Sequence, residues 1–184
     1  KIISAMAFAV TLFATSASFA QKEKTVMVGG AAMYPSKNIV ENAVNSKDHT
    51  TLVAAVKAAG LVDTLLSAGP FTVFAPTNDA FAKLPEGTVE TLLKAENLKT
   101  LQTILTYHVV AGKLNASDIA KAIKAGNGKA TLTTVAGGKL VASMDGKKLI
   151  LTDEMGGTST VTIADVNQSN GVIHVVDTVV LPKS

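Results

Sequence analysis

Hydrophobic and polar positions repeat with two different periods along this chain. Between residues 36 and 125, apolar side chains recur every three or four positions, which is typical of amphipathic helices that face a core. Between residues 131 and 176 they alternate with polar side chains, which is typical of half-buried strands. Because helices come mainly first and strands mainly last, the pattern predicts one α+β domain with antiparallel sheets.

Local signals refine these elements. Strands are expected at 71–75, 107–110, 131–135, 139–143, 148–152, 160–163 and 172–176. Threonine and serine side chains cap helix N-termini, so Thr50 or Thr51, Thr77 and Ser117 are the expected caps. Gly60 and Gly126 are expected to end helices, because glycine favours the position after the last helical residue.

The N-terminal region has the pattern of a secretory signal. One lysine precedes an apolar run over residues 2–13, and small residues follow at Ser18 and Ala20. The run is shorter than the roughly 20 residues that a membrane helix needs. We therefore expect residues 1–20 to be removed by cleavage after Ala20, giving a secreted or periplasmic protein without stable membrane insertion. Residues 21–35 are then a mature tail, either a tether or a strand laid on the domain, and 36–184 form the domain.

Composition narrows the function classes. The chain has no cysteine, so it has no disulfide framework, and its 17 basic and 14 acidic residues give a net charge of +3. All basic residues are lysines, and aromatic residues make up only 4%. Arginine is the preferred residue for bidentate phosphate recognition, so this composition argues against nucleic-acid binding.

Candidate catalytic chemistry is sparse. His49 is expected in a solvated turn, whereas His108 and His174 lie in apolar segments where a histidine is usually a hydrogen-bonded structural residue. Neither a cysteine nor a paired histidine spacing supplies a zinc site, and no Gly-x-Ser-x-Gly motif marks a nucleophile. The sequence therefore predicts no metal, no cofactor and no enzymatic activity.

Three segments resemble the motifs of the fasciclin (FAS1) domain. Residues 72–81 read TVFAPTNDAF and resemble the first box of the family, and residues 170–177 read NGVIHVVD and, with Leu181 and Pro182, resemble the second. Residues 105–110 read LTYHVV and fall where the family has its Tyr-His motif. The resemblance implies a FAS1-like fold with two antiparallel β-sheets in a wedge and several α-helices packed on one side.

The resemblance also implies a secreted, non-enzymatic adhesion or extracellular interaction module. The reported cell-attachment motifs of animal members correspond here to Tyr107, His108, Asp165 and Val166, where Val166 replaces the family's isoleucine. A structural role is expected for the other motif residues, which are Thr77, Asn78, Asp79, Asn170, Gly171, His174 and Asp177. The partner would be a cell-surface or matrix protein or a polysaccharide.

Two alternatives stay open at this point. A small-ligand-binding protein or enzyme could use a cleft near His108 or His174, and a perturbed histidine pKa in a concave pocket would favour it. A structural component of a matrix would instead show weak self-association.

Overall fold

The computed structural model describes residues 23–183. The expected signal at residues 1–20, with its cleavage after Ala20, lies outside this part of the chain. The elements follow in this order: β1 (Val26–Val28), β2 (Ala31–Met33), α1 (Ile39–Ala43), the 3-10 turn η1 (Lys47–His49), α2 (Thr50–Ala58), α3 (Val62–Leu66), β3 (Phe71–Pro76), α4 (Asn78–Ala82), α5 (Thr88–Leu92), the 3-10 turn η2 (Ala95–Asn97), α6 (Leu98–Tyr107), β4 (Val109–Ala111), α7 (Ala116–Ala125), β5 (Lys129–Thr133), β6 (Lys139–Asp145), β7 (Lys148–Thr152), β8 (Thr158–Gln168) and β9 (Gly171–Val176).

Seven strands form one sheet in the order β4-β3-β9-β8-β7-β6-β5, and β1 pairs with β2 in a separate hairpin. Strands β5 to β9 follow one another as antiparallel neighbours, as their short connections require. Strand β3 pairs in parallel with β9, with Phe71 opposite Gly171 and Pro76 opposite Val176. The two segments that resemble the family boxes are therefore neighbours at the centre of the fold.

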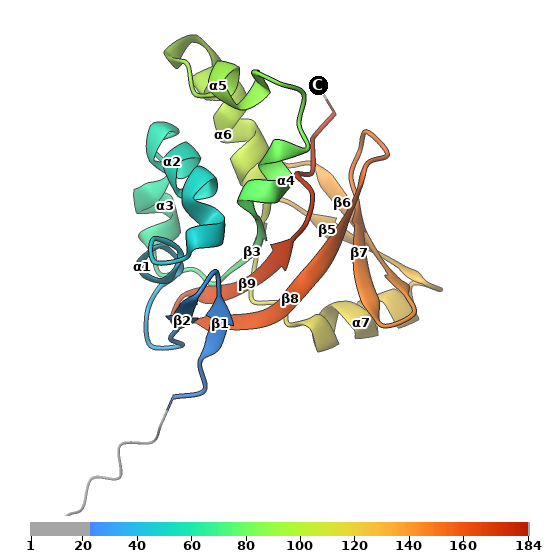
Figure 1. Ribbon diagram of the computed structural model, residues 1–184. Coiled ribbons are helices and arrows are strands. Elements are labelled where there is room, and N and C mark those ends of the chain that lie inside the picture. The colour runs from blue at the N-terminus through green and yellow to red at the C-terminus, as the bar shows by residue number, and fades with distance from the viewer. Residues whose placement is uncertain (1–22, 184) are drawn as a thin grey trace, which may run out of the picture.

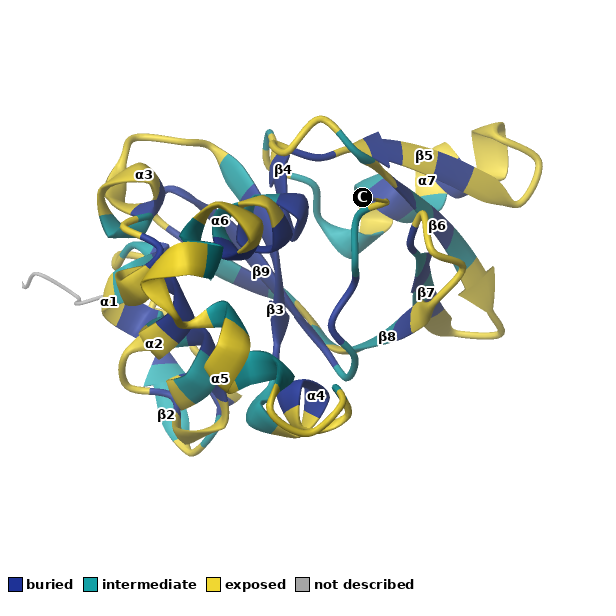
Figure 2. Ribbon diagram, turned by 90° about the horizontal axis from the view of Figure 1, so that it is seen from above, coloured by how far each residue is buried: buried dark blue, intermediate teal, exposed yellow. Residues whose placement is uncertain are grey.

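The helices cover the two ends of this sheet unequally. Helices α1 to α6 gather over β3 and β9, while α7 packs alone against β5 and β6 (Figure 1). Val73 and Ala75 of β3 lie in the core beneath the first group, and Phe74 lies in a second core with the residues of α7. Figure 2 shows β3 and β9 as continuous buried segments. Burial on both faces explains why β3 and β9 are mainly apolar, with Thr72 and His174 as the polar exceptions.

The hairpin of β1 and β2 belongs to the domain. Val28 and Met33 are 1% and 2% exposed and lie in the core beneath the helices. Gly29 has a positive φ of 57°, and a Cβ there would lie 2.3 Å from the Ser46 hydroxyl oxygen. Of the two alternatives for residues 21–35, the structure thus favours a strand laid on the domain, because residues 26–33 contribute side chains to its core.

The predicted α+β class is confirmed, but the sheets differ in detail from the expectation. The wedge of two antiparallel sheets is matched only loosely, because one seven-stranded sheet changes register along β8 and contains the parallel pair β3–β9. Local patterning reveals hairpins between consecutive strands. It does not reveal a pairing between strands about a hundred residues apart.

Some local expectations are wrong. Tyr107 is the last residue of α6 and His108 is its C-cap, so the expected strand over 107–110 begins only at Val109. Thr77 caps α4 as expected, with its hydroxyl oxygen 3.2 Å from the amide of Ala80. Ser117 does not cap α7, because the helix begins at Ala116 and Ser117 is its second residue.

Helix α2 also begins differently from the expectation. Thr50 is its first residue and Thr51 its second, so neither threonine is the N-cap. The N-cap position is held by His49, whose side chain makes no capping hydrogen bond. The 3-10 turn η1 leads directly into α2, and this continuation replaces the expected cap.

Candidate functional site

The first box connects β3 to the helical layer. After Thr77, the Asn78 side chain accepts hydrogen bonds from the Thr50 hydroxyl (3.1 Å) and the Thr51 amide (3.0 Å). Its own amide donates to the Lys47 carbonyl at 2.8 Å. All of these contacts are internal, so Thr77 and Asn78 fix α4 and α2 relative to each other. Asp79 is exposed in the first turn of α4, where a carboxylate interacts favourably with the helix dipole.

Asn170 and Gly171 at the start of the second box hold the chain at the opposite end of β3. The buried Asn170 side chain accepts from the Ile39 amide at 3.0 Å and donates to the Leu65 carbonyl at 2.7 Å. A Cβ at position 171 would lie 2.0 Å from the Phe71 carbonyl oxygen, so only glycine fits there. This close approach allows β9 to pair with β3.

His174 is buried between β9, β8 and the loop before α7. Its Nδ1 accepts the Asp165 amide at 3.2 Å, and its Nε2 lies 2.7 Å from the Leu114 carbonyl oxygen, to which it donates. The ring stacks on Phe74, with centroids 5.6 Å apart. Burial lowers the pKa of His174 and keeps the ring neutral, which this pattern of one donor and one acceptor requires.

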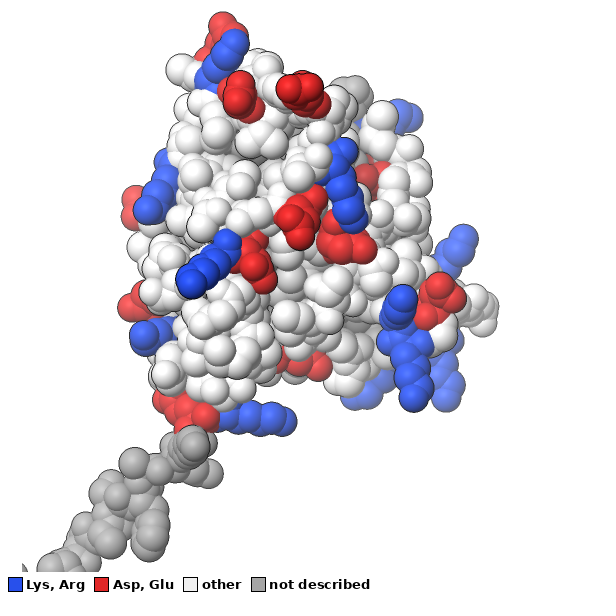
Figure 3. Space-filling model, in the orientation of Figure 1, with Lys and Arg blue, Asp and Glu red and all other residues white. Residues whose placement is uncertain are grey.

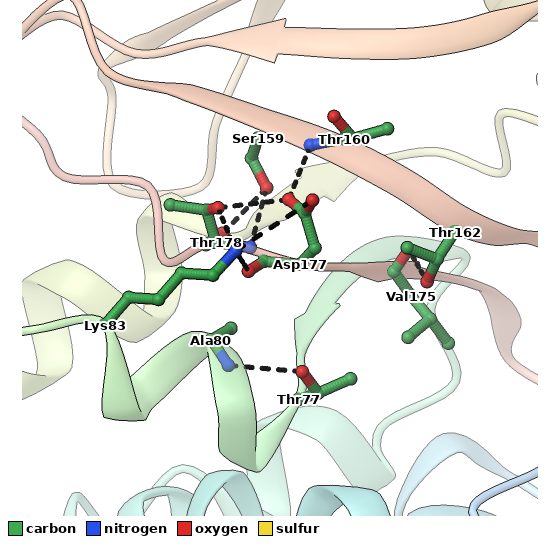
Figure 4. Close-up of polar contacts among 9 residues, drawn as sticks. All are labelled: Thr77, Ala80, Lys83, Ser159, Thr160, Thr162, Val175, Asp177 and Thr178. Carbon is green, nitrogen blue, oxygen red and sulfur yellow. Dashed lines mark hydrogen bonds and ion pairs between the residues drawn. The ribbon is translucent and has the colours of Figure 1, made fainter.

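Asp177 joins β9 to β8 and α4. Its carboxylate accepts hydrogen bonds from the Thr160 amide at 2.9 Å and the Thr178 hydroxyl at 3.0 Å. The Lys83 ammonium group lies 4.0 Å from the same carboxylate and donates to the Asp177 carbonyl at 2.6 Å (Figure 4). Asp177 therefore has a positional role within the fold.

Tyr107 lies in the interior. It is 0% exposed, and its hydroxyl donates to the Lys139 carbonyl at 2.6 Å and accepts from the Glu154 amide at 3.2 Å. Burial raises the pKa of Tyr107 to about 12. Its hydroxyl connects the end of α6 to β6 and to the turn after β7.

His108 is also buried, at 2% exposure. Its Nδ1 lies 2.8 Å from the Ile104 carbonyl oxygen and donates to it, while Nε2 accepts the Val180 amide at 3.1 Å. Burial lowers the pKa of His108 to about 4, so the ring is neutral at physiological pH. Both nitrogens are used inside the fold.

Asp165 and Val166 lie where β8 changes register. Asp165 has a positive φ of 58°, and its carboxylate accepts the Ala116 amide at 2.6 Å at the start of α7. Val166 is 0% exposed in the core beneath the helices. Asp165 therefore orients α7, and Val166 packs inside.

These positions change the interpretation of the expected attachment residues. The side chains of Tyr107, His108 and Val166 face the interior, and Asp165 is only partly exposed. The expectation that these four residues form a binding surface therefore does not fit the observed conformation. Apolar packing explains the difference, because the Tyr107 ring lies in the second core with Phe74 and Val110.

The expectation for His49 is also wrong. The ring is 1% exposed rather than solvated, with Nδ1 2.9 Å from the Ser46 hydroxyl and Nε2 3.4 Å from the Ala75 carbonyl oxygen. Burial lowers its pKa. The turn η1 directs the ring against β3, a long-range contact that the polar local sequence does not reveal.

The expected cleft near His108 and His174 is found only in part. An apolar crevice has His49 and His108 in its wall, but His174 does not line it. Within residues 23–183, no three histidine, aspartate or glutamate side chains come together in a way that could hold a metal ion. None of the described helices is long and apolar enough to cross a membrane.

A concentration of positive charge is the surface feature that sequence reasoning missed. Residues 113–148 contain seven lysines and two aspartates, a net charge of +5, whereas the other described residues contain eight lysines and twelve acidic residues, a net charge of −4. We call this region the lysine lobe, and its lysines are Lys113, Lys121, Lys124, Lys129, Lys139, Lys147 and Lys148. All seven are exposed. The lysines are scattered along the sequence, but the packing of α7 on β5 and β6 brings them to the same part of the molecule.

Figure 3 shows several of these positive side chains gathered at the end of the molecule formed by α7 and the β5–β7 strands. Lys124 lies near the end of α7, Lys129 begins β5, and Lys147 lies in the turn between β6 and β7. The one ion pair described within the lobe, Lys121 with Asp118, has an N–O distance of 3.8 Å on an exposed surface. The lobe is therefore a weakly neutralised positive surface.

Comparison with known proteins agrees with this architecture. The Fasciclin domain family model matches residues 47–182, which include both boxes and the Tyr-His segment. This chain belongs to the fasciclin family. The match confirms the resemblance found in the sequence motifs.

Relatives and a solved structure support the assignment. Protein sll1483 of Synechocystis is 48% identical over 161 residues, covering 87% of this chain and 82% of that protein. The cell surface glycolipoprotein MPB83 of Mycobacterium bovis is 30% identical over 189 residues, covering 91% and 77%. The FAS1 domain pair from the insect cell adhesion molecule fasciclin I aligns with a TM-score of 0.55 and 25% identity, covering 71% of this chain and 43% of that chain.

Proposed function

We propose that this protein is an exported, non-enzymatic adhesion module that contacts acidic polysaccharide at a cell surface or in a matrix through the lysine lobe. Membership of the fasciclin family supports an interaction role, since two relatives are described as a cell surface glycolipoprotein and a cell adhesion molecule. The signal-like residues 1–20 support export to the periplasm or beyond. The separation of charge between the lobe and the rest of the domain carries the proposal.

The chemistry of the lobe fits a polymer of repeated negative charges. Lysine ammonium groups are compact, strongly hydrated charges on long side chains, and they match spaced carboxylates or sulfates without the fixed geometry that arginine imposes. A net charge of +5 against −4 elsewhere also orients the molecule before contact. Binding through the lysine charges does not need the buried Tyr107-His108 segment at the interface. The motif residues then serve to stabilise the domain that carries the lobe.

The expected strength follows from exposed ion pairs. Each is worth about 0.2–1 kcal/mol, so the loss of three weakens binding by about 0.6–3 kcal/mol, roughly threefold to a hundredfold. Because exposed charges are screened over about 10 Å at 0.1 M salt, binding should weaken steeply as salt is added.

The test is binding of the mature chain to immobilised alginate, a polyuronate, with neutral dextran as the reference surface. A lobe variant, Lys124→Gln/Lys129→Gln/Lys147→Gln, should lose at least about threefold in affinity. A control variant, Lys47→Gln/Lys94→Gln/Lys99→Gln, removes the same charge from the helical half and should bind nearly as wild type does. Equal losses in both variants would show that only net charge matters and would refute a binding surface on the lobe. Equally tight binding to double-stranded DNA would refute the preference for polysaccharide.

A further inference from the structure

An apolar crevice lies between the helical layer and the sheet. Its volume is about 70 Å³. It is lined by side chains of α1, α2 and α3 on one wall and of β3, β4 and β9 on the other. Almost all of these side chains are aliphatic or aromatic, which is typical of a site for an apolar ligand.

The crevice crosses the strands. The sheet order β4-β3-β9 places Val109, Val73 and Ile173 side by side along one wall, with Ile39 of α1 and Val135 at opposite ends. Val135 extends this wall beyond β4, because its amide donates to the Val109 carbonyl at 2.7 Å. With strands about 4.8 Å apart, these residues span roughly 15 Å. The volume of about 70 Å³ is smaller than a hydrocarbon chain of that length, so the aliphatic side chains of the two walls must move apart when such a chain enters.

Water is a poor occupant of this space. A bound water needs two to four polar partners, but His49 and His108, the two imidazoles in the wall, already use their nitrogens within the fold. Val135 is 46% exposed at one end, so the apolar wall reaches solvent. An apolar chain would remove this surface from water, which is favourable in proportion to the area covered.

One charged side chain lines the crevice. Lys57 of α2 is exposed, and neither of the ion pairs found within residues 23–183 includes it. A cation beside an apolar crevice matches an amphiphile that has an anionic head and an apolar tail. We propose that the crevice binds a linear fatty acid, with the acyl chain across β9, β3 and β4 and the carboxylate at Lys57. Val135 is the one lining residue that belongs to residues 113–148, and none of the lobe lysines lines the crevice, so the site is independent of the adhesive role.

The test uses dodecanoate as the probe, with binding to the mature chain measured by calorimetry and by displacement of a fluorescent fatty acid. Saturable one-to-one binding is expected. Ala43→Phe places a ring in the crevice and should reduce affinity at least tenfold. The matched control is Ala82→Phe, because Ala82 is also the last residue of a five-residue helix but is exposed outside the crevice. Absence of saturable binding, or equal binding by both variants, would overturn the proposal.

The role of Lys57 has its own test, which does not perturb the core. Lys57→Gln should weaken dodecanoate binding at least fivefold and leave binding of dodecanol, which has the same chain without the charge, unchanged. Lys99→Gln is the control on the exposed surface of α6. Equal affinity of wild type and Lys57→Gln for dodecanoate would refute the carboxylate assignment.

Discussion

The buried neutral histidines predict that this fold loses stability in mild acid, and His108 allows the size of the effect to be calculated. Its Nδ1 donates to Ile104 and its Nε2 accepts from Val180, so the two hydrogen bonds require a neutral ring. Burial lowers the pKa from 6.5 to about 4. Below pH 6.5 the unfolded chain therefore binds a proton that the folded chain does not bind. The free energy of unfolding falls as the pH falls, until the folded ring is itself protonated near pH 4.

The magnitude follows from the two pKa values. A pKa lowered from 6.5 to about 4 corresponds to about 3 kcal/mol of stability that is present at neutral pH and lost near pH 4. Burial lowers the pKa values of His49 and His174 as well, so their contributions have the same sign. Since domains are typically stable by about 5–15 kcal/mol, His108 alone accounts for a large fraction.

Urea unfolding followed by circular dichroism, at several pH values between about 7.5 and about 4, measures this dependence. The matched variant is His108→Gln, whose amide retains a donor and an acceptor but does not titrate in this range. It should be less stable than wild type near neutrality and should lose about 3 kcal/mol less on acidification. The same pH dependence in both proteins would refute the reasoning, because other groups would then cause the acid sensitivity.

Two further predictions concern residues of the motif segments, and the same urea assay near neutral pH tests both. Gly171→Ala should destabilise the fold by about 1–3 kcal/mol or more, because the added Cβ would lie 2.0 Å from the Phe71 carbonyl oxygen; a change below about 0.5 kcal/mol would contradict the packing of β9 on β3. Tyr107→Phe should cost about 1–2 kcal/mol through loss of the hydroxyl that donates to the Lys139 carbonyl, whereas Tyr34→Phe at a 40% exposed side chain should change little. Equal effects of the two tyrosine substitutions would show that the buried hydroxyl is not stabilising.

Much of the fold could be predicted from local patterns. The alternating segments gave five strands near their observed positions, and the sequence before α4 correctly indicated Thr77 as its cap. These features depend on neighbouring residues, so the local sequence contains the needed information. The parallel pairing of β3 with β9 depends on contacts across the chain and was not predicted.

The candidate site was harder to predict for the same reason. The motif resemblance singled out Tyr107 and His108, but whether a side chain faces solvent depends on the packing of distant elements, and both are buried. His49 looked like a turn residue because its neighbours are polar, yet it packs against β3. The lysine lobe cannot be recognised as a run of charge in the sequence, because its seven lysines are spread over residues 113–148. They come together only when α7 packs on β5 and β6.

Retention of the mature protein on intact cells of its own source tests the adhesive role most directly. The wild type, the lobe variant Lys124→Gln/Lys129→Gln/Lys147→Gln and the control variant Lys47→Gln/Lys94→Gln/Lys99→Gln would be compared after circular dichroism has shown that all three are folded. The account predicts that wild type and control variant are retained, that the lobe variant is washed off, and that added alginate releases the retained protein. Retention of the lobe variant at the wild-type level, or no retention of any of the three, would contradict it.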